Sequence, residues 1–279
     1  MTVNIGKHEC AGLWDHVYYF ALSDYPNISD WELRKLICFC DYEKKHGRKT
    51  KIACKKRSIV KVVRHAFANP ALFIPAQKPQ FIPGYTACGQ CKQKGCLTEF
   101  LCHTTNVESA KSIFRCGRIL SAVNARNQPA AALAEEPRNA AGDPPDYFDY
   151  VMLNWGNCQA GDRLVMERML GRFPDERNLS VGFQPGIRFY FAYNTIAAHK
   201  DFTEDGCHAA KIKDALALAE YLYCCVIPSQ HKAEFEDIVP GPLAERVFYL
   251  ENDCGDIWEW SDKVYGFVSD MKISGLFHS

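Results

Sequence analysis

Two carboxylates lie one helical turn apart near the C-terminus, at Asp256 and Glu259, and tryptophans flank the second of them. The surrounding sequence predicts one helix, because apolar residues recur at helical spacing: Ile257, Trp260, Val264, Phe267 and Val268. The carboxylates then share the adjoining face with Lys263. Such a pair can accept a proton from an attacking amine and return it to a leaving oxygen. Alternatively, Asp256 only caps the helix N-terminus, where an acid accepts hydrogen bonds from free N–H groups.

A second set of polar residues falls at the ends of predicted strands. His103 and Thr104 lie where a strand over 100–104 passes into a helix, and Arg188 and Tyr190 share one face of a strand over 187–193. This layout resembles the nucleotide-binding opening of ADP-ribosyltransferases, in which a His and a hydroxyl residue hold the nicotinamide ribose. The resemblance implies an NAD-dependent transferase acting on nucleic acid or protein, with Glu259 as its late glutamate. The alternative is a strand-end His beside a helix-capping Thr.

Further acids are interleaved with aromatic residues over 142–168, namely Asp143, Asp146, Asp149 and Asp162. They either bind a guanidinium or ammonium ligand, by bidentate pairing and cation–π contact, or close on the chain's own arginines. His208 and Lys211 follow at what we expect to be the start of a helix.

The cysteines number 14 and include one cluster, Cys88, Cys91 and Cys96. A C-x-x-C pair is half of a zinc site, but no second close pair follows. We therefore expect a polar loop of small buried thiols without metal, and a zinc site is the alternative. Because no export signal accompanies the cysteines, we expect reduced thiols and a cytoplasmic protein. No apolar run is long enough for a membrane span.

Positive charge is concentrated near the N-terminus although the whole chain is neutral. Only Asp41 and Glu43 offset the basic residues between positions 34 and 64. This block predicts a nucleic-acid contact, because phosphate neutralisation supplies most nonspecific affinity, although a merely solvated face is the alternative. The candidate contact residues are Lys44, Lys45, Arg48, Lys49, Lys55, Lys56 and Arg57.

The elements that position these residues predict a mixed α+β fold. Ser29 and Glu32 form a capping-box pattern ahead of a helix that ends at Gly47, and 58–67 predicts a second helix. Prolines then mark a linker. We therefore expect a helical, basic region over 1–68, a Pro/Cys-rich linker over 69–97 and a mixed α/β catalytic domain over 98–279. Further strands are expected over 221–228 and 246–250, and a long loop over 128–145.

Four segments between residues 146 and 268 together resemble the fungal arginine-containing cyclodipeptide synthases: DYFDYVMLNWGNCQAGDRLVMER, PGIRFYFAY, DGCHAAKIKDALALAEYLYCCVIP and DIWEWSDKVYGFV. That family uses aminoacyl-tRNAs to make diketopiperazines in secondary metabolism and has a D-D-x-x-E motif. Here Asp256 and Glu259 match its second Asp and its Glu. Gly255 replaces the first Asp, and Asp253 is the acid available in its place.

The resemblance implies a tRNA-dependent aminoacyltransferase that takes arginyl-tRNA and a second aminoacyl-tRNA, with no cofactor. No P-loop, G-x-G-x-x-G, G-x-S-x-G or H-E-x-x-H pattern appears, and an already activated ester needs no ATP. Glu259 would be the base, with its pKa raised by Trp258 and Trp260, and Asp256 would hold the arginyl group. The other substrate-binding candidates are Asp253, His103, Arg188, Tyr190, Asp149 and Trp258. A noncatalytic RNA-binding protein remains a third hypothesis.

Overall fold

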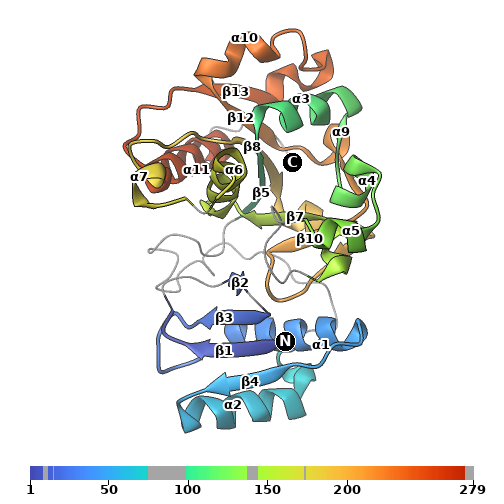
Figure 1. The fold of residues 1–279 in the computed structure, drawn as a ribbon, viewed down its shortest axis with the longest axis vertical. Helices are drawn as coiled ribbons and strands as arrows, with labels where there is room; N and C mark the ends of the chain where they lie inside the picture. Colours follow the sequence, from blue (N-terminus) through green and yellow to red (C-terminus); the bar gives the residue numbers. More distant parts are fainter. Residues whose placement is uncertain (9–11, 15, 75–98, 137–143, 173, 274–279) are drawn as a thin grey trace.

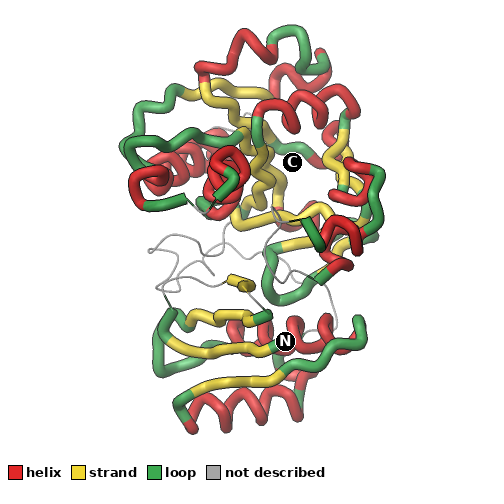
Figure 2. The backbone as a smooth tube through the Cα atoms, in the orientation of Figure 1, coloured by secondary structure: helices red, strands yellow, loops and turns green. Residues whose placement is uncertain are grey.

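The computed structural model describes the chain except for residues 9–11, 15, 75–98, 137–143, 173 and 274–279. The described residues form two units, an N-terminal unit over residues 1–74 and a C-terminal unit over residues 99–273 (Figure 1). Strands gather at the centre of each unit, with helices packed along them (Figure 2). None of the helices in the described part of the chain combines the length and apolar character needed to cross a membrane.

The N-terminal unit is a four-stranded sheet covered by two helices. The strands are ordered β2-β3-β1-β4; β1 is parallel to β3 and β4, whereas β2 is antiparallel to β3. Their bounds are β1 (Thr2–Gly6), β2 (Gly12–Trp14), β3 (Val17–Ala21) and β4 (Lys51–Cys54). Two α-helices and a short 3-10 helix complete the unit: α1 (Asp30–Lys45), α2 (Arg57–Ala68) and η1 (Pro70–Leu72). One core joins sheet and helices, with Val3, Leu36 and Phe39 fully buried.

The two helices confirm the predicted helical segments, but the prediction of a helical N-terminal region is not confirmed, because the unit also contains a four-stranded sheet. Ser29 and Glu32 form the capping box, and Gly47 follows the end of α1 with a φ of 73°. The sheet was missed because its strands are three to five residues long and only Val3 and Ile5 of β1 are buried. Such short alternation is a weak sequence signal.

The C-terminal unit is built on a seven-stranded, mostly antiparallel sheet in the order β13-β12-β8-β5-β7-β10-β9. Only β12 and β13 are parallel among its pairs. The strands are β5 (Phe100–Thr105), β7 (Tyr150–Trp155), β8 (Ile187–Ala192), β9 (Phe202–Thr203), β10 (Ala210–Lys213), β12 (Cys224–Pro228) and β13 (Val247–Leu250). A separate pair is formed by β6 (Arg118–Leu120) and β11 (Ala215–Ala217).

Helices cover both faces of this sheet (Figure 2). The longer ones are α3 (Val107–Cys116), α6 (Ala160–Leu170) and α11 (Ile257–Ile273). The shorter helical segments are α4 (Ala122–Arg126), α5 (Ala130–Ala134), η4 (Pro145–Asp149), α7 (Glu176–Leu179), α8 (Tyr193–Ala197), α9 (Leu218–Tyr221), η5 (Ser229–His231), α10 (Lys232–Phe235) and η6 (Gly241–Arg246). The predicted loop over 128–145 therefore contains α5.

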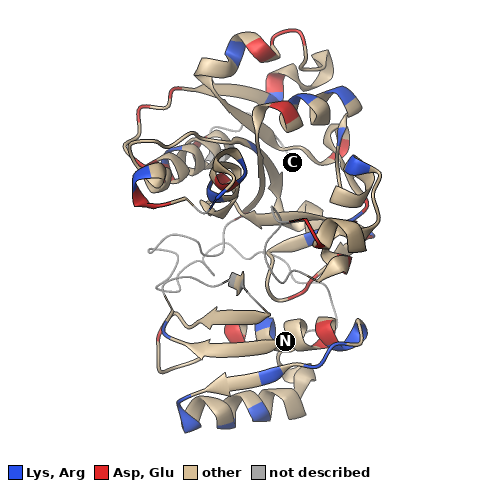
Figure 3. Cartoon of the chain, in the orientation of Figure 1, with Lys and Arg blue, Asp and Glu red and all other residues tan. Residues whose placement is uncertain are grey.

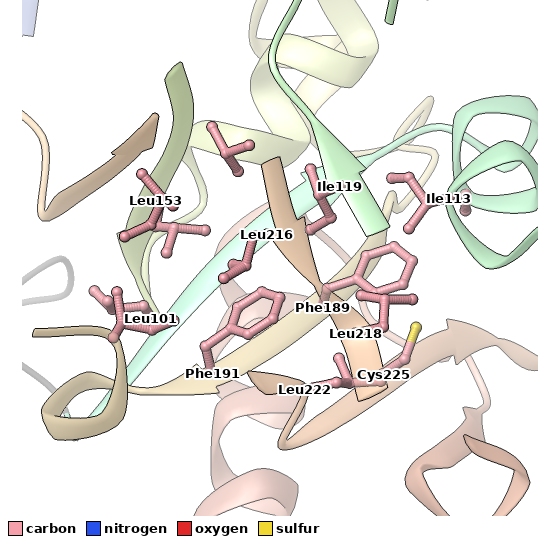
Figure 4. Close-up of a cluster of buried hydrophobic side chains, with 14 of the residues drawn as sticks. Leu101, Ile113, Ile119, Leu153, Phe189, Phe191, Leu216, Leu218, Leu222 and Cys225 are labelled. Carbon is pink, nitrogen blue, oxygen red and sulfur yellow. The ribbon is translucent and has the colours of Figure 1, made fainter. Parts of the chain in front are cut away.

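Each face of the sheet has its own core. On one face, Phe189 and Phe191 of β8 pack with Leu101, Leu216 and Ile113 of α3 (Figure 4). On the other face, α11 packs Ile257, Trp260, Val264 and Val268 against Tyr190, Cys102 and Val226. The apolar stripe predicted for the C-terminal helix is therefore confirmed. Since side chains alternate along a strand, neighbouring residues of β5 and β8 face different cores.

Two sequence-based placements were wrong in detail. Lys211 lies in strand β10 and not at a helix start, because the segment from Ala210 to Lys213 pairs with β7. The strand predicted over 221–228 begins only at Cys224, since Tyr221 ends α9.

The two units meet along an inter-unit seam between α1 and the loop over residues 204–208. Arg34 Nη2 donates to Glu204 Oε2 at 2.6 Å, and Tyr18 Oη donates to the Gly206 carbonyl at 2.9 Å. Gly206 has a φ of 70°, and a Cβ there would lie 2.0 Å from the carbonyl oxygen of Lys35. The loop backbone therefore lies directly against helix α1, where only glycine fits.

Lys211 lies fully buried at this seam. Its Nζ is 3.1 Å from Asp205 Oδ2 and 3.8 Å from the ring centres of both Tyr42 and Tyr147, with Tyr150 at 4.7 Å. Tyr42 belongs to α1, so both units supply rings around the ammonium group. Burial lowers the pKa of Lys211, and Asp205 opposes that shift. The seam therefore encloses a cation that is held by one carboxylate and aromatic faces.

A second ionic contact crosses the seam at Asp146. Arg48 donates to Asp146 Oδ1 at 2.5 Å and to Glu43 Oε1 at 2.7 Å, and Tyr42 Oη donates to Asp146 Oδ2 at 2.5 Å. Burial would raise the pKa of Asp146, but Arg48 and Tyr42 outweigh it and lower this pKa. Asp146 thus binds an arginine of the chain itself.

Candidate functional site

The acidic pair at the start of α11 is arranged as a helix cap. Asp256 Oδ1 accepts hydrogen bonds from the backbone N–H groups of Trp258 and Glu259, both at 2.8 Å. Glu259 Oε2 accepts from the backbone N–H of Gly255 at 2.8 Å. The capping interpretation is therefore confirmed, and it leaves one oxygen of each carboxylate without a hydrogen bond among the described residues.

The residues around this pair differ in exposure. Glu259 is exposed and Trp258 is partly buried, whereas Trp260 is fully buried in the core beneath the helix. Asp253 is exposed and forms an ion pair with Lys263, which also donates to the Glu251 carbonyl at 2.8 Å. Asp253 therefore lies on the same exposed end of α11 but is engaged by a lysine.

Arg188 and Tyr190 lie beneath α11 with their side chains fully buried. Arg188 forms a two-pronged ion pair with Asp162 of α6, and its Nη1 donates to the Tyr190 and Ser261 hydroxyls, both at 3.2 Å. Tyr190 Oη donates to the Gly156 carbonyl at 3.1 Å. Burial disfavours the Arg188 charge, but Asp162 outweighs it and raises the pKa of Arg188. These side chains have no exposed surface to offer a ligand.

His103 lies on the opposite face of the sheet from Tyr190. In the β5–β8 register His103 stands opposite Phe189, whereas Cys102 stands opposite Tyr190. Phe189 and Tyr190 belong to the cores on the two different faces. His103 Nδ1 is 3.3 Å from the Met152 carbonyl, and burial lowers its pKa to about 4. The structure thus does not bring His103 together with Tyr190 and Glu259.

The acids interleaved with aromatics serve different purposes. Asp162 binds Arg188 and Asp146 binds Arg48, as expected for a segment that closes on its own arginines. Asp149 is partly buried at the end of η4, where its carbonyl accepts from the backbone N–H of Asp214 at 2.9 Å. Asp143 lies outside the described residues.

The basic residues of the N-terminal unit mostly face solvent, on the end of α1, the following loop and the start of α2 (Figure 3). Arg48 is the exception, because it turns inward to Glu43 and Asp146. We call the exposed set the basic surface, which consists of Lys44, Lys45, Lys49, Lys55, Lys56 and Arg57. None of these six residues forms an ion pair within the described part of the chain.

Helix α2 concentrates this charge at an unfavourable place. Its first turn contains no acid and its N-cap residue, Lys56, makes no side-chain capping bond. Cations at a helix N-terminus oppose the helix dipole, which favours anions there. Lys61 and Arg64 are also exposed. Lys61 lies four residues after Arg57 and Arg64 three residues after Lys61, so they extend the same helix face. The sequence-based site omitted these two, although their spacing on a predicted helix could have identified them.

The cysteines in the described part of the chain form no disulfide. Cys88, Cys91 and Cys96 lie outside the described residues. Within them, no group of three His, Cys, Asp or Glu side chains is placed to hold a metal ion. Burial raises the pKa of Cys102 to about 12, which keeps this thiol protonated and a poor nucleophile.

Comparison with protein-family models, curated proteins and solved structures finds no match in any of the three. The geometry of the described residues gives two groups of candidate functional side chains. One is the basic surface of the N-terminal unit and the other is the acidic pair at the exposed start of α11.

Proposed function

We propose that the protein is an aminoacyl-tRNA-dependent cyclodipeptide synthase, which binds tRNA through its basic surface and forms an arginine-containing diketopiperazine. The observation that supports this most is the basic surface itself. Six exposed cations have no ion pair among the described residues, and they form two groups at opposite ends of β4. Three lie at the end of α1 and in the loop before β4, and three lie at the N-terminal, positive end of α2. Phosphates are the anions that such a surface fits, and their neutralisation releases counterions.

The chemistry is two aminolyses. In the first, the amine nitrogen of one aminoacyl group bonds to the ester carbon of the other, and the bond from that carbon to the ribose oxygen breaks. In the second, the free amine of the dipeptidyl group attacks the remaining ester carbon, which closes the ring and releases the second tRNA. Each step takes one proton from the amine and delivers it to the departing ribose oxygen.

Glu259 is the proposed carrier of that proton. It is exposed, and only its Oε2 is engaged by the Gly255 N–H, so Oε1 can receive a proton. The free oxygen of Asp256 and the carboxylate of Asp253 lie at the same end of α11. Carboxylates are suited to an arginyl guanidinium, which they bind by charge-assisted hydrogen bonds.

The NAD-dependent alternative has less support. It requires His103, Tyr190 and Glu259 to converge on one nucleotide. His103 lies on the other face of the sheet, and Tyr190 is fully buried with its hydroxyl bonded to the Gly156 carbonyl.

The test is expression in a host with charged tRNAs, followed by mass spectrometry of the medium for arginine-containing diketopiperazines. We expect product from the wild type and none from Glu259→Gln, whose amide oxygen can still accept from Gly255 but whose side chain cannot carry a proton. Asp270→Asn, an exposed acid later in the same helix, is the control and should keep full product. Both variants should melt like the wild type.

Two results would reject the proposal. One is the absence of any diketopiperazine from a folded wild-type protein that binds tRNA. The other is release of nicotinamide from NAD that depends on His103 and Glu259, which would favour the transferase.

A further inference from the structure

The first turns of α11 are held from below by a buried polar network. Its side chains are Asp162, Arg188, Tyr190 and Ser261, and each is at most 2 % exposed. Arg188 alone reaches three elements, since it binds Asp162 of α6, Tyr190 of its own strand β8 and Ser261 of α11. Ser261 stands two residues after Glu259.

The same network fixes the loop that connects β7 to α6. Ser261 Oγ donates to the Asn157 carbonyl at 3.0 Å, and Tyr190 Oη donates to the Gly156 carbonyl at 3.1 Å. Asp162 Oδ1 accepts from the Gly186 N–H at 2.9 Å, which adds the segment before β8. Helix α11 is thereby tied to one loop, one strand and one neighbouring helix.

A network of this kind is a poor source of stability. Burying an ion pair costs several kcal/mol of desolvation per ion, and well-packed apolar residues often serve the fold as well or better. A polar network in which every group is hydrogen-bonded instead holds the elements that it joins in one specific arrangement. Here the element so fixed is the one that carries the two carboxylates.

We propose that Arg188 and Ser261 are positioning residues, which set the rotation and depth of α11 so that the Asp256 and Glu259 carboxylates face the reacting groups. This rests on the proposed function. It replaces the sequence-based expectation that Arg188 binds substrate, because its guanidinium is fully buried and already uses Asp162, Tyr190 and Ser261. A substrate guanidinium would also be repelled by this like charge.

Ser261→Ala is the sharpest perturbation, because it removes one hydroxyl and leaves the Arg188–Asp162 pair in place. A misplacement of about 1 Å at a reacting group can cost roughly 100-fold in rate. We expect kcat for diketopiperazine formation to fall by roughly that factor. KM for arginyl-tRNA should stay within about twofold, since the basic surface lies in the other unit. Ser269→Ala, on the same helix and with a side chain that makes no hydrogen bond among the described residues, is the matched control.

Ser261→Thr separates positioning from packing. Threonine keeps the hydroxyl but adds a methyl group in a site that is only 2 % exposed. If the hydroxyl fixes the helix, Thr should retain more kcat than Ala. If only close packing matters, Ala should be the better tolerated of the two, and that order would overturn the proposal.

Hydrogen exchange of the purified protein tests the positioning without relying on the reaction. The backbone N–H groups of Trp258 and Glu259 are bonded to Asp256 Oδ1. We expect Ser261→Ala to speed their exchange at least tenfold and Ser269→Ala to leave it unchanged. Unchanged exchange in Ser261→Ala would overturn the positioning role. A wild-type protein that makes no diketopiperazine but shows the faster exchange in Ser261→Ala would instead reject the function and leave the network's role standing.

Discussion

Replacing Lys211 by methionine tests how the inter-unit seam is held together. Methionine keeps an unbranched, apolar stem and removes the ammonium group from the three tyrosine rings. It leaves Asp205 fully buried, with the His208 ring nitrogen at 2.8 Å as its remaining ionisable partner. The result is a buried carboxylate that has lost the closest full cation.

The structure sets the size of the effect. Removing one partner of a buried ion pair costs about 3–5 kcal/mol, because the other charge stays buried without compensation. His208 and the Cys207 N–H still contact Asp205, which places the expected loss near the lower limit. At about 2–4 °C for each kcal/mol, the melting temperature should fall by at least about 6 °C.

The assay is thermal and urea unfolding of the full chain at pH 7, monitored by circular dichroism. Lys213→Met is the matched control, since Lys213 belongs to the same strand but is exposed, and it should change stability by less than about 0.5 kcal/mol. The double variant Lys211→Met/Asp205→Asn should lose less than the sum of the single changes. If Lys211→Met is no more destabilising than Lys213→Met, the tyrosine-enclosed lysine does not stabilise the seam.

Three further outcomes are expected. The free energy of unfolding should rise with pH between about 4 and 6.5, because the His103 pKa is lower in the folded chain, so the unfolded chain binds the extra proton in this range. His103→Gln should flatten that part of the pH–stability curve. Gly206→Ala should prevent the units from docking, as judged by limited proteolysis, whereas Gly47→Ala, with a similar φ of 73° and open space around it, should cost only about 1–2 kcal/mol. Reversing the charge of four lysines to Glu should weaken tRNA binding, for the set Lys44, Lys45, Lys55 and Lys56. The slope of log affinity against log salt concentration should become shallower by about 0.7 to 0.9 for each phosphate that the protein no longer neutralises. An unchanged slope would mean a merely solvated surface.

Helix ends were predictable because the side chains that make them are local. The side chains of Ser29 and Glu32 each accept a hydrogen bond from the backbone N–H of the other residue. The Asn106 side chain accepts from the backbone N–H of Ser109 at the start of α3. Gly117 ends α3 with a φ of 69°, as glycine after a periodic segment indicates. The acidic pair likewise belongs to one helix turn, so its spacing alone placed both carboxylates at the start of α11.

The contacts between segments far apart in the chain were not predictable from the sequence. Arg34 and Glu204 are 170 residues apart in the chain, and nothing in either segment indicates the other. For His103 and Tyr190, strand periodicity gives the alternation within one strand only. Which residues of β5 and β8 share a face depends on the register between them, and that register separates the two side chains.

The inter-unit seam also limits how the protein can be divided for experiments. A fragment that ends near residue 74 would uncover the backbone of α1 at Lys35 and Phe39, which Gly206 covers. A fragment that begins near residue 99 would lose Tyr42 and Arg48, so Lys211 would lose one of its aromatic partners and Asp146 would lose its arginine. The proposed tRNA binding and the proposed catalysis should therefore be tested separately by point substitution in the intact chain. A protease cut between the units should leave two halves that remain associated until denaturant parts them.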